Sequence, residues 1–148
     1  MYTPIIQQSD LTTLIYIEKL NAVTRGDTTI IPKQINAAIN EVQSYLTRFS
    51  LPALFGDPIA NTAATVYDEW LNNLCKDVAA WHMIKLGNCG IDMTVIRTGY
   101  EDAIATLKRI QGLKQTPQNW PLLNLDTIKQ TPGNPVEIKG RRKRGNNY

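Results

Sequence analysis

The stretch from Tyr67 to Leu86 constrains the fold of this chain more than any other feature of its sequence. Its apolar residues recur at steps of three and four, which places them on one side of an α-helix. They are Tyr67, Trp70, Leu71, Leu74, Cys75, Val78, Trp81 and Ile84. Two of the three tryptophans of the chain are among them, and each aromatic side chain buries about 150–250 Å². The sequence therefore predicts a mostly buried helix over residues 67–86 at the centre of the core.

Helical spacing also predicts two helices before the central one. The first covers about residues 10–21, and the Ser9-Asp10 pair in front of it is suited to cap a helix. The second covers about residues 32–49, since proline fits a first helical turn. Residues 28–31 between them are β-branched, so we expect extended backbone there.

The last helix is expected over about residues 95–113. Its start is ambiguous, because a capping-box pattern begins at Thr98 whereas the apolar phase continues back to Val95. Gly99 inside a helix costs only about 1 kcal/mol. We therefore expect the helix to run through Gly99 with an irregularity there.

A long loop is expected between the second and third helices. It covers residues 50–64 and contains Pro52, Gly56 and Pro58. Loops of this length within a compact domain are uncommon and often functional. Its apolar residues either fold back over the core or contact a partner. They are Leu51, Leu54, Phe55 and Ile59.

These elements predict an all-α fold, a small four-helix bundle over residues 1–114. From 115 to 148, prolines and glycines recur and no helical period is sustained. Trp120, Leu122 and Leu123 nevertheless lie there, and purely disordered tails usually lack such residues. We expect an extended arm that lies on its own bundle or on a neighbouring chain.

The net charge of +3 hides an asymmetry. Residues 139–144 carry five cations and no acidic residue: Lys139, Arg141, Arg142, Lys143 and Arg144. Without them, 11 Lys and Arg stand against 13 Asp and Glu, so the rest of the chain carries about −2 and no general attraction to nucleic acid. The basic run contacts phosphate groups, contacts an acidic protein surface, or is a solvated terminus.

The sequence offers little for catalysis. It contains none of the common signatures of nucleotide binding, zinc proteolysis or serine hydrolysis. His82, the only histidine, lies on the central helix, and a nucleophilic pair with Cys89 would lack an orienting group. The adjacent carboxylates Asp68-Glu69 and Glu101-Asp102 diverge on a helix and fit better as complements to its dipole. We expect neither enzyme activity nor a bound cofactor or metal.

The location of the chain follows from what it lacks. No apolar run approaches the length of about 18 residues that marks a candidate membrane span, and we see no signal peptide. Two cysteines do not form a disulfide framework. We therefore expect synthesis in a reducing compartment, the cytoplasm, and no membrane partner.

The order of the helical segments resembles a phage family. The segments are SYLTRFSLP at 44–52, LNNLCKDVAAWHMIKLG at 71–87 and YEDAIATLKRIQ at 100–111. They are similar to the Mu-like virion proteins, which are related to the head–tail adaptors of long-tailed phages. The resemblance covers about residues 8–113 and does not extend to the tail after Thr116.

The resemblance implies a structural virion protein at the head–tail interface, made in the host cytoplasm. Such a protein docks on the portal protein as a homo-oligomeric ring of about a dozen copies, extends the DNA channel and receives the tail or stopper protein. The residues expected to bind partners are Leu54, Phe55, Ile59, Trp120, Leu122 and Leu123. The basic run would lie near packaged DNA or an acidic protein surface. The alternative is a small helical nucleic-acid-binding or regulatory module that uses this run.

Overall fold

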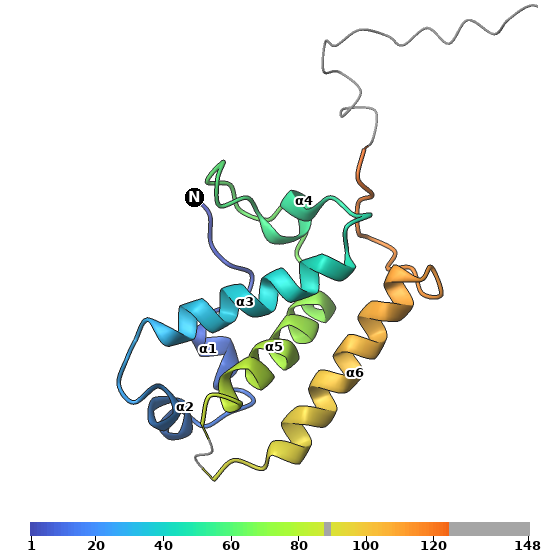
Figure 1. Ribbon diagram of the computed structural model, residues 1–148. Coiled ribbons are helices and arrows are strands. Elements are labelled where there is room, and N and C mark those ends of the chain that lie inside the picture. Colours follow the sequence, from blue (N-terminus) through green and yellow to red (C-terminus); the bar gives the residue numbers. More distant parts are fainter. Residues whose placement is uncertain (88–89, 125–148) are drawn as a thin grey trace, which may run out of the picture.

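The computed structural model describes residues 1–87 and 90–124 (Figure 1). These residues form six helices and, apart from two isolated antiparallel bridges, no β-structure. The helices are α1 (Gln8–Leu11), α2 (Ile17–Thr24), α3 (Ile30–Tyr45), α4 (Leu51–Phe55), α5 (Glu69–Ile84) and α6 (Met93–Gln111). The predicted all-α class is confirmed for this part of the chain. Within it, none of the helices combines the length and the apolar character that a membrane crossing demands.

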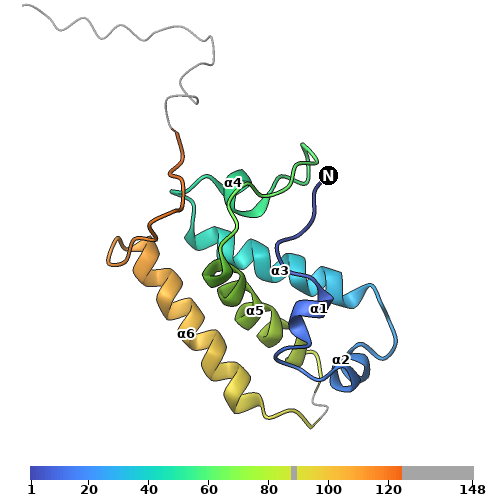
Figure 2. The same ribbon diagram turned by 180° about the vertical axis from the view of Figure 1, so that it is seen from behind.

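Helix α5 is the centre of the core. It lies between α3 and α6 and also contacts α1 and α2 (Figure 1 and Figure 2). Its apolar stripe is buried or half-buried from Leu71 to Ile84, whereas Tyr67 precedes the helix and is 80% exposed. The helix starts directly after Asp68, because the Asp68 carboxylate accepts a hydrogen bond from the Trp70 N–H at 2.8 Å. The prediction of a central, mostly buried helix is confirmed.

The single helix predicted over residues 10–21 is wrong, because two short helices, α1 and α2, occupy this region. The hydroxyl groups of Thr12 and Thr13 donate to the backbone carbonyls of Ser9 and Asp10, at 2.6 and 2.7 Å. Such local bonds offer the backbone an alternative to the helical pattern. α1 therefore ends early, and α2 begins after a non-helical connection.

The extended backbone predicted over residues 28–31 is wrong, since residues 28–29 form a turn and α3 begins at Ile30. The Asp27 carboxylate accepts hydrogen bonds from the N–H and the hydroxyl of Thr29, at 2.9 and 2.8 Å, and so forms a turn. The helix starts from this turn. Pro32 lies in the first turn of α3, where a missing N–H removes no helical hydrogen bond.

The region predicted as a loop, residues 50–64, contains α4 and a tight turn. Pro52 lies in the first turn of α4, where proline is favoured. The backbone N–H groups of Thr65 and Val66 both donate to the Ala53 carbonyl, at 2.9 and 3.0 Å. The region is therefore folded onto itself rather than open.

Helix α6 begins before Thr98 and continues through Gly99. Asp92 caps it by accepting a hydrogen bond from the Thr94 N–H at 2.9 Å. The Thr98 hydroxyl donates to the Thr94 carbonyl at 2.9 Å instead of capping a helix of its own. The earlier start, indicated by the apolar phase, is correct, and the helix is continuous where an irregularity was expected.

Gly99 lies where α6 passes Asp77 of α5. A Cβ atom at Gly99 would lie 3.5 Å from Asp77 Oδ1, which is an ordinary van der Waals contact. Gly99→Ala is therefore expected to raise the free energy of unfolding by about 0.5–1 kcal/mol, because alanine lowers the entropy of the unfolded chain. Urea denaturation measures the change. Gly112→Ala is the control, since its Cβ would lie only 3.3 Å from the Lys108 carbonyl oxygen. A loss of stability at Gly99 would show that α5 and α6 are too close for a methyl group.

Candidate interaction site

Three of the six residues predicted to bind partners lie in the core. Leu54, Phe55 and Trp120 are 0%, 1% and 4% exposed. Leu54 and Phe55 lie on the inner face of α4, so the interpretation that the apolar loop folds back over the core is correct for them. Trp120 anchors the chain's own C-terminal segment. The burial of all three side chains leaves no surface on them for a partner.

Ile59, in contrast, projects from a tight turn and is 96% exposed. The backbones of Asp57 and Thr62 exchange two hydrogen bonds, at 2.9 and 3.0 Å. The Asp57 carboxylate accepts two more, from the N–H groups of Ile59 and Ala60 at 2.8 and 3.1 Å. We call residues 57–62 the hairpin. Its backbone is held by four hydrogen bonds while its most apolar side chain lies in solvent.

The C-terminal segment, residues 112–124, turns back from α6 and runs past the end of α3 (Figure 1 and Figure 2). The Ser50 N–H donates to the Pro121 carbonyl at 2.8 Å, and the Leu123 N–H donates to the Arg48 carbonyl at 2.9 Å. Over its described residues, the predicted arm therefore lies on its own chain. It does not start as a separate unit at the end of α6.

Leu122 and Leu123 remain exposed on this segment, at 63% and 39%. The guanidinium of Arg48, the residue to which the Leu123 N–H donates, lies over the Phe49 ring, 4.6 Å from its centroid. Its Nε and Nη2 atoms are buried and have no hydrogen-bond partner among the described residues. This end of α3 therefore combines two exposed leucines with two buried Arg48 nitrogen atoms that have no hydrogen-bond partner in the described part of the chain.

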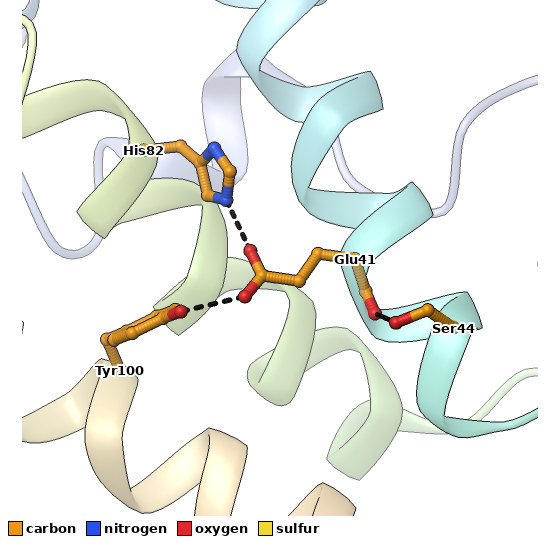
Figure 3. A network of polar contacts seen from close by, with 4 residues as sticks. All are labelled: Glu41, Ser44, His82 and Tyr100. Atoms are coloured by element: carbon orange, nitrogen blue, oxygen red, sulfur yellow. Dashed lines mark hydrogen bonds and ion pairs between the residues drawn. The ribbon is translucent and has the colours of Figure 1, made fainter.

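A polar contact joins α3, α5 and α6 at half-buried depth (Figure 3). One Glu41 carboxylate oxygen accepts a hydrogen bond from the Tyr100 hydroxyl at 2.7 Å, and the other lies 2.6 Å from His82 Nε2. Burial alone would raise the pKa of Glu41, but the bonds from His82 and Tyr100 outweigh it and hold that pKa below its ordinary 4.5. Burial, together with the bond to Glu41, raises the pKa of Tyr100 to about 12. These two interactions of Glu41 therefore link α3 to both α5 and α6.

Tyr100→Phe removes one bond to the Glu41 carboxylate and is expected to lower the free energy of unfolding by about 1–2 kcal/mol at pH 7. The native state holds the pKa of Glu41 below 4.5, so its stabilisation is complete above pH 4.5 and is lost as the pH falls through the native value. The effect of Tyr100→Phe should therefore shrink in acid. Urea denaturation between pH 3 and pH 7 (roughly the range over which carboxylates titrate) measures this.

Tyr45→Phe on α3 is the matched control, because the Tyr45 hydroxyl has no hydrogen-bond partner in the described part of the chain. Its effect should be small and independent of pH. An equal, pH-independent loss for Tyr100→Phe would show that the ring of Tyr100, and not its hydroxyl, stabilises the fold.

The described side chains offer little else for chemistry. No group of three or more metal-ligating side chains occurs among residues 1–87 and 90–124. The Cys75 thiol is fully buried, and burial raises its pKa far above the usual range, so it is not a nucleophile. The pairing of His82 with Cys89, which the sequence analysis disfavours, cannot be placed, because Cys89 lies outside the described residues. The basic residues Lys139, Arg141, Arg142, Lys143 and Arg144 also lie outside them.

Two features were missed by sequence reasoning. One is the contact of Glu41, because nothing near it in the sequence indicates that Tyr100, 59 residues later, reaches it. The other is an apolar groove lined by Leu14, Tyr16 and Val95. Leu14 lies within the range of the predicted helix over residues 10–21, but it falls in the connection between α1 and α2. The only sequence signal for the groove is that apolar residues occur just before α2 and in the first turn of α6.

Known proteins add no further information about these surfaces. No protein-family model, no curated protein and no solved structure matches this chain. Its own residues are therefore the basis for a functional assignment.

Proposed function

We propose that this chain is a structural virion protein, a head–tail adaptor that forms a ring on the portal protein. In this proposal a small four-helix bundle is the scaffold, the ring extends the DNA channel, and the tail or stopper protein docks on its far side. The resemblance of the three helical segments to Mu-like virion proteins supports the assignment. A rigid helical body whose described residues contain no cluster of catalytic or metal-binding groups is compatible with it.

The observation that carries the proposal is the character of one end of the molecule. We call residues 1–9 and 51–66 the uncharged end, because Asp57 is the only charged side chain in them. The two stretches lie together, since the Tyr2 N–H donates to the Asn61 side-chain carbonyl at 2.9 Å and the N-terminus lies beside the hairpin (Figure 1). The hairpin presents Ile59 there on a fixed backbone. Interface cores between proteins are depleted of charge, so this end favours a protein partner over nucleic acid.

Electron microscopy of the full chain with portal-containing heads tests the proposal. We expect rings at the portal vertex and little affinity of the free chain for DNA. Absence of rings, together with DNA binding that weakens steeply with salt, would favour the nucleic-acid-binding alternative. Replacing the five cations of residues 139–144 with glutamine identifies the source of any such binding.

The contribution of the arm is tested by a truncation placed after Asn124. A cut at residue 115 would remove Trp120 from the core and confuse loss of folding with loss of contact. A cut after Asn124 keeps Trp120, Leu122 and Leu123 in place. We expect fewer rings on heads from this shortened chain at unchanged stability. Unchanged ring occupancy would exclude a role for residues 125–148 in assembly.

A further inference from the structure

An apolar groove lies at the opposite end of the molecule from the hairpin. It is formed where α2 and α6 begin, and its open volume is about 340 Å³. Leu14, Tyr16 and Val95 line it and are 42%, 79% and 67% exposed. The half-buried Ile91 and Ile96 also line it, together with two charged residues, Lys19 and Asp92. Large apolar side chains that are exposed together around a groove often mark an interaction site, whereas single exposed apolar residues are common on any protein surface.

The chain leaves this groove empty for a local reason. Tyr16 precedes α2 with extended backbone, φ −57° and ψ 141°, and Asp92 precedes α6 with φ −69° and ψ 96°. The groove lies between the residues that precede α2, Leu14 and Tyr16, and the first turn of α6, which contains Val95. A side-chain cap fixes the start of α6, since the Asp92 carboxylate accepts a hydrogen bond from the Thr94 N–H, whereas Tyr16 makes no such bond at the start of α2.

The hairpin offers a side chain that matches the groove. Ile59 is the most exposed large apolar residue of the described part of the chain, and its neighbours Pro58 and Ala60 are exposed and uncharged. A cavity of about 150 Å³ lined by aliphatic side chains holds a benzene molecule. A groove of about 340 Å³ therefore has room for an isoleucine side chain and its flanking residues.

Ile59 cannot reach the groove of its own chain. The hairpin lies beside the N-terminus and α4, whereas α2 and the start of α6 lie at the other end of the body (Figure 1 and Figure 2). A contact between Ile59 and the groove would therefore join the hairpin of one copy to the groove of another. Such a heterologous contact closes into a ring when the rotation per copy allows, and otherwise continues as a filament.

We propose that Ile59 of one copy inserts into the groove lined by Leu14, Tyr16 and Val95 of the next copy. This inference rests on the proposed ring and names the contact between its neighbours. One side chain and its flanks bury an area at the low end for protein interfaces, so free copies associate weakly. Copies held side by side on a portal experience a high effective concentration, which makes the same contact effective.

Cross-linking between single-cysteine variants tests the contact. Ile59→Cys and Val95→Cys are prepared separately in a chain that carries Cys89→Ser, while Cys75 stays in place because it is buried. A disulfide needs Cα atoms about 4.4–6.8 Å apart, so it reports direct contact. The mixture of the two variants, oxidised at high concentration, should give at least about tenfold more heterodimer than the control mixture, a difference that corresponds to about 1.4 kcal/mol.

The control mixture pairs Ile59→Cys with Leu113→Cys. Leu113 is 68% exposed, like Val95 at 67%, but it lies at the far end of α6. Equal cross-linking in both mixtures would overturn the inference. So would self-cross-linking of Ile59→Cys alone, which would indicate hairpins that meet tip to tip.

Ile59→Asp separates this inference from the proposed function. Ile59 contributes nothing to the core, so the variant should fold normally by circular dichroism and lose the heterologous contact. Rings on heads that form normally from Ile59→Asp would refute the contact and leave the adaptor function standing. Specific cross-links from a chain that never binds heads would refute the adaptor function and leave the contact standing.

Discussion

Trp120→Ala is expected to lower the free energy of unfolding by about 3–5 kcal/mol, the range for loss of a buried aromatic side chain. The indole is 4% exposed. It meets the Phe49 ring edge-on at 5.5 Å between centroids and the Trp70 ring at 5.8 Å. Its N–H donates to the Asp68 carboxylate. Alanine removes all of these contacts at once, and urea denaturation of the full chain measures the loss.

Two variants divide this effect into its parts. Trp120→Phe keeps an aromatic ring and removes the bond to Asp68, so it should cost about 1–3 kcal/mol. Leu122→Ala changes a neighbour on the same segment that is 63% exposed, so it should cost less than about 0.5 kcal/mol. Equal losses for Trp120→Ala and Leu122→Ala would mean that the C-terminal segment is not anchored to the body.

Asp68 couples the anchor of the C-terminal segment to the central helix. Through Oδ1 it caps α5, by accepting the Trp70 N–H, and through Oδ2 it accepts the Trp120 indole N–H. The residue that starts the core helix therefore also anchors the C-terminal segment, residues 112–124, to the body.

The sequence predicted the long helices well, because each buries one face and repeats it over several turns. α3, α5 and α6 all follow the apolar spacing. The prediction for the α1–α2 region was wrong because the Thr12 and Thr13 hydroxyls donate to backbone carbonyls. The spacing of apolar residues contains no information about such hydrogen bonds. For α6, the apolar spacing back to Val95 predicted the helix start better than the capping-box pattern at Thr98 did.

The candidate surfaces were predicted only in part, because burial depends on contacts that are distant in sequence. Trp120 bonds to Asp68 across 52 residues, and nothing in the tail shows whether it covers its own body or a neighbour. Leu54 and Phe55 lie inward and Ile59 outward on one continuous segment. Leu54 and Phe55 are separated from Ile59 by the turn at Asp57, whose carboxylate accepts hydrogen bonds from the Ile59 and Ala60 N–H groups. The sequence alone does not reveal these hydrogen bonds.

Gly56→Ala is expected to lower the free energy of unfolding by about 3–5 kcal/mol. Gly56 has φ 78° and ψ 175°, a region that is almost restricted to glycine. A Cβ atom there would also lie 2.7 Å from the Thr62 carbonyl oxygen and 3.0 Å from the Ala64 nitrogen. Both are backbone atoms, so they cannot rotate away. The hairpin must move, which breaks the bonds between Asp57 and Thr62.

Gly26→Ala is a control at a positive φ where the added methyl group causes no steric clash. Gly26 has φ 79°, but a Cβ atom there meets nothing within 4 Å, so only the backbone strain of about 1–2 kcal/mol remains. Hydrogen exchange then locates the damage: the Asp57 and Thr62 amides should lose protection in Gly56→Ala and keep it in Gly26→Ala. Equal losses of stability with both amides still protected would mean that the hairpin yields to a methyl group without breaking. The hairpin backbone would then be deformable, and its rigidity could not explain why the Ile59 side chain is held in solvent.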